Sequence, residues 1–464
     1  MPIGTLFSLY YRDNDITALL GASLITILCG LGILVIIGQQ PSYDDLSKRE
    51  GYVSVALSWI LISVFGALPY VIHGSIPSYT DAFFETISGF TTTGASILTD
   101  IEALPHGLLF WRSLTHWLGG MGIIVFSLAI LPLLGVGGAQ LFTAEVSGPT
   151  KDKIHPQVRG TAKRLWAVYV VLTLVNAGAL MLCGMNLFDA LCHAFGTIAT
   201  GGFSTRNASM AAFSPAAQYV TIFFMFVSGI NFSLHYYGMV KGRIEAYLCD
   251  EELRFYALLV LINVSFVGAA SLYHHQGKDT ELVLRNAAFA VVSVMSTTGF
   301  GTADYETFAP FARFIFLVLL FSGACAGSTS GAIKIVRILV LARNGILEFG
   351  RLLHPRAIIP VRLNGKSVPP NILHNILAFF ALYMLVFLNG TLLLAILGLD
   401  MDSAMGAVAS CQGGVGPGIG SVGPVANYAH VADAGKWVLS GVMLLGRLEL
   451  FTLLVVFSPY YWRK

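Results

Sequence analysis

Long apolar segments separated by short polar connections run along the whole chain. A bilayer core needs about 20 consecutive helical residues, and most of these segments are long enough to cross it. The stretch Met1–Tyr11 is too short to span, so it is predicted to lie at the membrane interface or to end a helix that begins upstream. The predicted spans are Thr17–Gly38, Gly51–His73, Leu108–Leu134, Leu165–Gly184, Ala216–Val240, Phe255–Tyr273, Pro310–Ala324, Ala332–Leu341, Ile372–Leu397 and Trp437–Phe457.

Two of these segments are short and lie on either side of a stretch of small residues. Pro310–Ala324 and Ala332–Leu341 flank Ser322–Gly331, which contains three glycines besides serine, threonine and alanine. We interpret the two segments as one helix that is interrupted inside the membrane. Such a break is tolerated only where the irregular backbone is buried in protein or lines a cavity.

Composition supports lipid as the main solvent of this protein. The 464 residues are 55% hydrophobic and 11% charged, whereas soluble domains carry about 25% charged residues. The net charge of +2 gives no general attraction to nucleic acid. The six cysteines form no CxxC pair, which indicates small buried side chains and neither a disulfide framework nor a metal site.

Basic residues predict the orientation of the spans. Cytoplasmic connections of membrane proteins carry an excess of Lys and Arg. Here alternate connections are basic, so these connections and the C-terminus are predicted to face the cytoplasm. The basic residues are Lys48, Arg49, Lys151, Lys153, Arg159, Lys163, Arg164, Lys241, Arg243, Arg254, Arg337, Arg343, Arg351, Arg356, Arg362, Lys366, Arg463 and Lys464.

Four short segments on the opposite side share one layout. They cover residues 81–95, 189–203, 286–300 and 403–417, and they align without gaps. Each is predicted to be a helix too short to span, followed by a loop with glycine in the same column. The predicted N-cap residues are Asp81, Asp189, Asn286 and Ser403. The shared glycines are Gly94, Gly202, Gly299 and Gly416.

This layout is typical of a pore loop for a monovalent cation. The carbonyl end of a half-helix favours a cation, and glycine permits backbone angles that turn carbonyls toward an axis. One such segment could equally be an ordinary turn or a packing contact, but four matched copies favour a ring that replaces the hydration shell of an ion. The predicted ion-binding residues are Thr92, Thr93, Gly94, Thr200, Gly201, Gly202, Thr297, Thr298, Gly299, Gly414, Val415 and Gly416.

The predicted fold is an all-α polytopic membrane protein with pseudo-fourfold symmetry around one pore. Residues 1–50 form an extra N-terminal helical segment, and each later part is a helix–pore loop–helix repeat. The four repeats are predicted to cover 51–140, 141–250, 251–366 and 367–464. The fourth lacks the threonines of the others, so its quadrant of the ring differs chemically.

The chain resembles the Trk/Ktr/HKT superfamily of cation transporters, most closely its bacterial TrkH branch. The resemblance covers almost the whole chain. It rests on the motif DAFFETISGFTTTGAS from Asp81, GGMGIIVFSLAILPLLGVGGAQL from Gly119, ATGGFST from Ala199, GACAGSTSGAIKIVRI from Gly323 and GRLELFTLL from Gly446.

The resemblance implies a multi-pass protein of the bacterial cytoplasmic (inner) membrane that takes up potassium. It implies a homodimer with one pore per protomer, regulated by cytoplasmic TrkA-like subunits that bind NAD or ATP. Glycine at the first filter column, here Gly94, goes with potassium preference in this superfamily. Potassium is then the transported ion, and neither an organic cofactor nor a nucleic-acid partner is expected.

The resemblance also implies an intramembrane gating loop at Ser322–Gly331. Its alternative is a close-packed kinked helix. Arg447 is interpreted as a positive charge below the filter that holds the gate, or else as a salt-bridged packing residue. Lys334 could tether the loop or extend to the cytoplasmic surface. The predicted gating residues are Gly323, Gly327, Ser328, Thr329, Gly331, Lys334 and Arg447.

Three further polar residues lie in the apolar segments. Glu85 could concentrate cations, or it could be a hydrogen-bonded buried carboxyl or a rim residue. His193 occupies the same column in the second repeat, and we interpret it as a structural histidine. Asn231 is interpreted as a hydrogen-bonding residue between helices.

The sequence shows no catalytic motif, since it has no P-loop lysine, no GxGxxG between strand and helix and no HExxH. The chain is therefore predicted not to be an enzyme. Two other kinds of transporter stay open: a sodium- or proton-coupled symporter, and a secondary carrier for a small organic solute. A receptor or scaffold is disfavoured because it has no use for four matched cation-facing loops.

Overall fold

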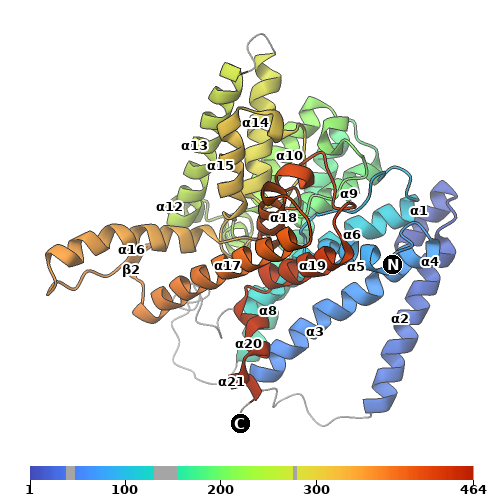
Figure 1. Ribbon diagram of the computed structural model, residues 1–464, viewed down its shortest axis with the longest axis horizontal. Coiled ribbons are helices and arrows are strands. Elements are labelled where there is room, and N and C mark those ends of the chain that lie inside the picture. Colours follow the sequence, from blue (N-terminus) through green and yellow to red (C-terminus); the bar gives the residue numbers. More distant parts are fainter. Residues whose placement is uncertain (38–47, 130–153, 275–278, 463–464) are drawn as a thin grey trace.

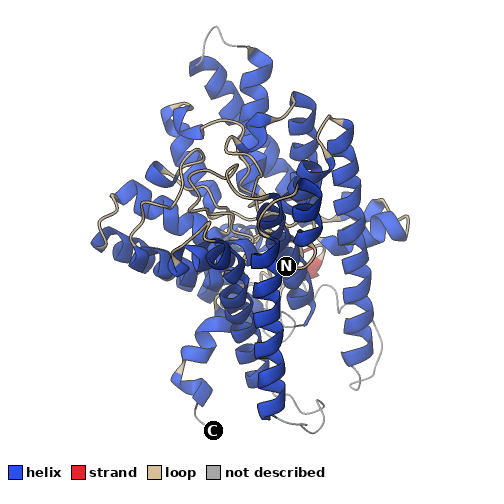
Figure 2. Ribbon diagram, turned by 90° about the vertical axis from the view of Figure 1, so that its right-hand side faces the viewer, coloured by secondary structure: helices blue, strands red, loops and turns tan. Residues whose placement is uncertain are grey.

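The computed structural model describes residues 1–37, 48–129, 154–274 and 279–462. These residues are almost entirely helical, and the loops gather between the helices (Figure 2). The one hairpin in the described part pairs β1 (Arg362–Leu363) with β2 (Lys366–Ser367) in antiparallel fashion. The predicted all-α class is therefore confirmed. Residues 130–134 of the predicted span Leu108–Leu134, and the basic residues Lys151, Lys153, Arg463 and Lys464, lie outside the described residues.

The N-terminal segment contributes two helices, α1 (Gly4–Tyr11) and α2 (Ile16–Ile37). The predicted short N-terminal stretch is thus a helix of its own, which packs against α6 (His106–Ala129). Asp13 and Asp15 lie between the two helices and accept hydrogen bonds from the backbone N–H groups of His106 and Leu108. These carboxylates cap α6, because the first N–H groups of a helix have no partner within it.

Four helix–loop–helix units follow, in the order predicted from the repeats (Figure 1). Each unit has an outer helix, a short pore helix and a second long segment. The outer helices are α3 (Lys48–Gly66) with α4 (Leu68–His73), α8 (Ile154–Leu182), α13 (Glu251–His274) and α17 (Pro370–Ile396). The pore helices are α5 (Tyr79–Phe90), α9 (Leu187–Ile198), α14 (Thr280–Met295) and α18 (Met401–Gly413). The second segments begin with α6, α10 (Pro215–Ser228), α15 (Pro310–Leu320) and α19 (Asp433–Arg447).

Three of the second segments are broken, whereas the sequence predicted a break in the third repeat alone. The chain bends by 102° between α10 and the stretch Phe232–Val240, which holds α11 (Phe232–His235) and η4 (Tyr236–Val240). It bends by 117° between α19 and α20 (Phe451–Phe457). The predicted continuous spans Ala216–Val240 and Trp437–Phe457 were therefore wrong. Apolar composition alone cannot distinguish a straight span from a broken one, because both keep apolar side chains against lipid and protein.

The third repeat breaks where the sequence predicted it. Residues 321–334 separate α15 from α16 (Ile335–Leu353). Helix α16 runs well past the predicted end at Leu341 and extends from the body beside α17 (Figure 1). Arg337, Arg343 and Arg351 therefore lie on this helix and not in a connection.

Several helices are long and apolar enough to cross a membrane, as a multi-pass protein requires. Within the described residues there are five, or up to seven if each of the two bent pairs counts as one span. Shorter connecting elements complete the described chain: η3 (Ser209–Ala212), α12 (Glu245–Cys249), η5 (Tyr305–Thr307), η6 (Gly420–Val422) and α21 (Pro459–Trp462).

The predicted N-caps of the pore helices were wrong, by three residues in the first, second and fourth repeats and by seven in the third. Ser78, Asn186 and Asp400 cap α5, α9 and α18, each through a side-chain oxygen. The N–H groups that they accept belong to Asp81, Asp189 and Ser403, the residues predicted as caps. An N-cap oxygen accepts from the N–H of the residue two or three positions later, so the cap and the residue that donates to it are easily exchanged in a sequence. In the third repeat Asp279 caps α14, and Asn286 lies inside the helix.

Candidate functional site

The four predicted filter glycines meet in one closed ring. All four have left-handed backbone, with φ of +81° at Gly94, +82° at Gly202, +85° at Gly299 and +94° at Gly416. A Cβ atom on each would strike a carbonyl oxygen of another repeat. These oxygens belong, in the same order, to Gly201, Thr298, Val415 and Thr93. Repeat one thus faces two, two faces three, three faces four and four faces one, which closes the cycle.

The residue two positions earlier is also left-handed in every repeat. Its φ is +53° at Thr92, +54° at Thr200, +58° at Thr297 and +68° at Gly414. A side chain is strained in this region and glycine is not. The glycine of the fourth repeat therefore keeps the same backbone as the three threonines, although it removes a hydroxyl. Left-handed residues on both sides present the carbonyl of the middle residue to the neighbouring repeat.

Side-chain hydroxyls fix the middle residues of two repeats from behind. The hydroxyl of Thr93 lies 2.8 Å from that of Thr91, and the hydroxyl of Thr298 lies 2.7 Å from that of Ser296. All four side chains are buried. Thr91 and Ser296 are the C-cap residues of the pore helices α5 and α14. The segment that carries the glycine in each repeat, here called the filter strand, is therefore tied to its own pore helix.

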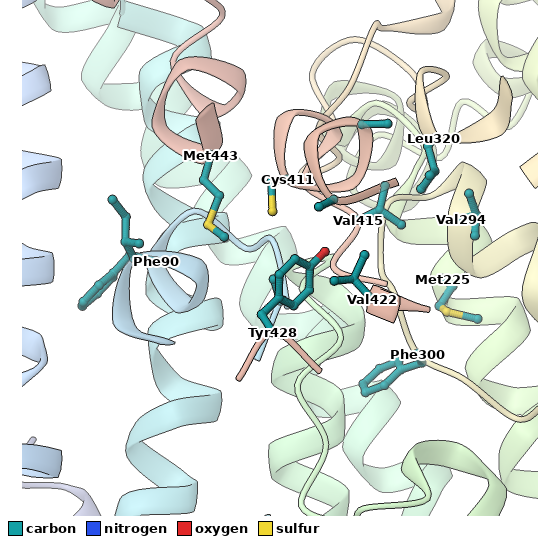
Figure 3. Close-up of a cluster of buried hydrophobic side chains, with 14 of the residues drawn as sticks. Phe90, Met225, Val294, Phe300, Leu320, Cys411, Val415, Val422, Tyr428 and Met443 are labelled. Carbon is teal, nitrogen blue, oxygen red and sulfur yellow. The ribbon is translucent and has the colours of Figure 1, made fainter. Parts of the chain in front are cut away.

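The fourth repeat is held through its glycine carbonyl instead. The hydroxyls of Ser410 and Tyr428 donate to the Gly416 carbonyl over 2.7 and 2.8 Å. Tyr428 lies with Cys411 and Val422 in the apolar cluster that surrounds this part of the filter (Figure 3). This carbonyl is therefore turned toward the protein, while the Val415 carbonyl faces Gly299.

A buried ion pair behind the first repeat was missed by the sequence reasoning. The Nε of Arg112 donates to Glu85 over 2.6 Å, and its Nη1 donates to the Ser204 carbonyl over 3.0 Å. Glu85 also accepts from the Ser96 hydroxyl and the Ile97 N–H. The pair therefore joins the chain that leaves the first filter strand to the chain that leaves the second. The sequence does contain a sign of this pair, since Arg112 lies inside the predicted span Leu108–Leu134. A charged side chain is costly within a membrane and therefore usually has a partner.

The hydrogen-bond partners of Glu85, His193 and Asn231 show what each polar residue does. Glu85 is a hydrogen-bonded buried carboxyl and not a rim residue. His193 is a structural histidine, bonded to the Asp189 carbonyl and the Ser204 hydroxyl over 2.7 and 2.9 Å. Asn231 caps α11 at the break of the second repeat by accepting from the Ser233 N–H.

The stretch Ser322–Gly331 lies directly against the start of the filter strands. The Thr329 hydroxyl donates to the Ile198 carbonyl over 3.0 Å, and the Gly331 N–H donates to the Thr297 hydroxyl over 2.8 Å. A Cβ atom on Gly331 would strike the Gly413 carbonyl. The stretch thus touches repeats two, three and four at the residues that precede the filter glycines.

The other predicted gating residues shape the same stretch. Gly323 packs so closely on the Gly331 carbonyl that a Cβ would overlap it. Gly327 has φ of +72° and lies against the Asn231 side chain, and its carbonyl accepts from the Phe232 N–H over 3.0 Å. The Ser328 hydroxyl donates back to the Cys325 carbonyl over 2.6 Å. The stretch is therefore an ordered loop and not a continuation of either helix.

Two cationic side chains hold this loop. Arg447 lies at the end of α19, not in mid-helix, and donates to the Thr329 carbonyl over 2.8 Å and the Gly119 carbonyl over 3.0 Å. Lys334 is buried and donates to the carbonyl and hydroxyl of Ser330, so it tethers the loop. Glu449 pairs with Arg337, and the described residues give Arg447 no salt bridge.

The arrangement offers main-chain oxygens as the candidate cation ligands. Among the described residues, no group of three or more His, Cys, Asp or Glu side chains could hold a metal ion. Rings of backbone carbonyls are the ligands that select alkali cations in channels. An ion in the ring would meet the carbonyl ends of four pore helices, which carry partial negative charge.

Comparison with known proteins gives one consistent family. The sequence model of the TrkH family, described as cation transport protein, matches residues 24–464. The Trk system potassium uptake protein TrkH of Halomonas elongata is 40% identical over 99% of this chain and 95% of its own length. The protein of the same name from Escherichia coli strain K12 is 40% identical over 100% of this chain and 96% of its own.

A solved structure agrees with this result. The crystal structure of the potassium transporter TrkH from Vibrio parahaemolyticus superposes with a TM-score of 0.91 at 37% sequence identity. The match covers 99% of this chain and 95% of that one. Helices, repeats and connections therefore follow the same order in both proteins.

Proposed function

Because the chain belongs to the TrkH family of cation transport proteins, we propose that it takes up potassium through the ring of filter carbonyls. The single observation that supports this most strongly is the closed cycle in which Gly94, Gly202, Gly299 and Gly416 each face a carbonyl of the next repeat. Such a cycle supports a site to which every repeat contributes a carbonyl oxygen.

Potassium enters from the side opposite the basic connections. Carbonyl oxygens replace the water around the ion, so no chemical reaction on this chain is needed. An inside-negative membrane potential contributes about 2.3 kcal/mol per charge for each 100 mV. The proposed ligands come from Thr92, Thr93, Gly94, Thr200, Gly201, Gly202, Thr297, Thr298, Gly299, Gly414 and Val415. The prediction of Gly416 as a ligand is withdrawn, because its carbonyl accepts hydrogen bonds from Ser410 and Tyr428.

The loop Ser322–Gly331 acts as the gate below this ring. Pore helices run inward from the outer face and the filter strands return outward, so residues that precede the glycines lie at the inner end. The loop contacts those residues, and Arg447 places a positive charge beside it. Transport requires the loop to move away and the Arg447 hydrogen bonds to break. The moving residues are Gly323, Gly327, Ser328, Thr329 and Gly331, held by Lys334 and Arg447.

Regulation comes from partners on the cytoplasmic side. The relatives are named as members of a Trk system, which indicates more than one component. We propose that this chain forms a homodimer. We also propose that TrkA-like subunits, which bind NAD or ATP, regulate it from the cytoplasm. The supporting feature is the basic set of inward connections, which suits acidic protein surfaces.

Potassium flux into proteoliposomes tests the proposal. Flux should follow the potassium gradient and potential without sodium or a pH gradient, and should rise when TrkA-like subunits are added. Reversal potentials that shift with sodium or pH would instead identify a coupled symporter. Rescue of a potassium-uptake-deficient bacterium is the matching test in cells, and failure of both assays would refute the proposal.

A further inference from the structure

Glu252, in the first turn of α13, contacts the middle of the gating loop and the start of the helix that follows it. One carboxylate oxygen accepts from the Ala326 N–H over 2.6 Å and from the Val336 N–H over 3.1 Å. The side chain is only 7% exposed. A single oxygen atom on α13, the outer helix of the same repeat, thus joins the middle of the loop to the first turn of α16.

The second of these bonds completes the start of α16. Val336 is the second residue of that helix, and Lys334 before it makes no side-chain cap bond. The first N–H groups of a helix have no partner within it, and a carboxylate there also meets the positive end of the helix dipole. The loop supplies a partner for the first N–H of α16, since the Ile335 N–H donates to the Ala324 carbonyl over 3.1 Å, and Glu252 supplies from α13 the partner of the second.

The residues before Glu252 connect it to the hairpin β1–β2. Asn364, at the hairpin tip, accepts from the Glu251 N–H over 2.9 Å and donates to Asp250 over 3.1 Å. Arg343 bridges Glu251 and the Arg362 carbonyl. The tip is exposed and lies on the side assigned to the cytoplasm, whereas Glu252 is buried beneath it.

We propose that Glu252 is a positioning residue of the gate, which keeps the loop against the filter and couples its position to the hairpin β1–β2. This inference rests on the proposed function, in which the loop obstructs the pore. Moving the loop outward breaks the bond from the Ala326 N–H, whereas the bond from the Val336 N–H keeps the carboxylate at the start of α16. Displacement of the hairpin shifts the first turn of α13 and weakens the same bonds.

A native cysteine reports on the loop independently of transport. Cys325 precedes Ala326 and is 1% exposed. In a background in which the more accessible Cys29, Cys183 and Cys249 are serine, labelling of Cys325 by a water-soluble maleimide measures loop opening. Loss of a hydrogen-bonded charge should speed labelling by at least about tenfold in Glu252→Gln and by more in Glu252→Ala.

The matched control is Glu348→Gln, on the exposed part of α16, where Glu348 pairs with Arg351 one turn away. This variant should label at the starting rate. Equal labelling in Glu252→Ala and in the control would overturn the role of Glu252. Asn364→Gly keeps the left-handed backbone at the hairpin tip while removing its bonds, so it should also speed labelling. No effect there would overturn the coupling to the hairpin.

Transport separates this inference from the proposed function. In Glu252→Gln, potassium flux without partner subunits should rise severalfold, while the potassium-to-sodium permeability ratio stays constant because no filter contact changes. Faster labelling in a protein that passes no potassium even before mutation would support the Glu252 contact and refute the proposed function. Loss of ion selectivity in Glu252→Gln would show that the residue supports the filter, and would overturn its assignment to the gate.

Discussion

Substitution of Gly94 by serine tests the filter ring directly. The φ of Gly94 is +81°, and a Cβ atom there would overlap the Gly201 carbonyl oxygen. A side chain in left-handed backbone costs about 1–2 kcal/mol, and the overlap must be relieved by moving that carbonyl. If this energy appears in ion discrimination, the potassium-to-sodium permeability ratio should fall by about 5- to 30-fold.

The assay is a bi-ionic reversal potential, with potassium on one side of the bilayer and sodium on the other. Gly301→Ser is the matched control, because a Cβ atom there has only the Pro424 carbonyl oxygen nearby, at 3.9 Å. It should leave the ratio unchanged. Gly416→Ala should lower the ratio less than Gly202→Ala. The added Cβ atom would lie 2.7 Å from the Thr93 carbonyl oxygen at Gly416, but only 2.1 Å from the Thr298 carbonyl oxygen at Gly202. An unchanged ratio in folded Gly94→Ser would refute the ring as the source of selectivity.

Three further outcomes are expected. Arg447→Gln should raise potassium flux severalfold in proteoliposomes, because it weakens two hydrogen bonds that hold the gate and removes a charge near the ion path; lower flux would contradict this. Glu85→Gln leaves Arg112 buried without its counter-charge, so unfolding should become easier by about 3–5 kcal/mol. Thermal unfolding in detergent measures this loss, and replacing both residues by glutamine should recover part of it. Hydrogen bonds from Ser403 hold the pKa of Asp400 below its ordinary value of 3.8. The ionised cap therefore adds its full stabilisation to the folded protein above pH 3.8, and this stabilisation is lost as the pH falls through the lower folded-state pKa. The thermal midpoint should therefore drop on acidification, and Asp400→Asn should remove this component of the drop.

The filter was predictable because its constraints are local. Each repeat has two left-handed residues two positions apart, the second of which is always glycine. Because the chain contains four copies, this recurring glycine is visible in the single sequence without an alignment. That the resulting ring binds potassium stays a prediction. The same reasoning located the break at Ser322–Gly331, since ten small residues in a row rarely continue a membrane helix.

The missed features depend on partners distant in sequence. The pairing of Glu85 with Arg112 requires two helices to meet behind the filter, which no local pattern encodes. The bend after α19 places Glu449 and Leu450 at φ of +56° and +54°, and neither residue type signals left-handed backbone. The cap offset in the pore helices arose differently, because an N-cap and the residue whose N–H it binds are both polar.

The four carbonyl-bearing strands belong to one polypeptide, so each can be altered without copying the change to the others. In a pore assembled from identical subunits, a point mutation replaces every ligand of a layer together. In the proposed filter, the same mutation would alter a quarter of the ion ligands and leave the rest intact. Ion preference can consequently shift in small steps, and the fourth quadrant, where Gly414 stands in place of threonine, already differs in this way.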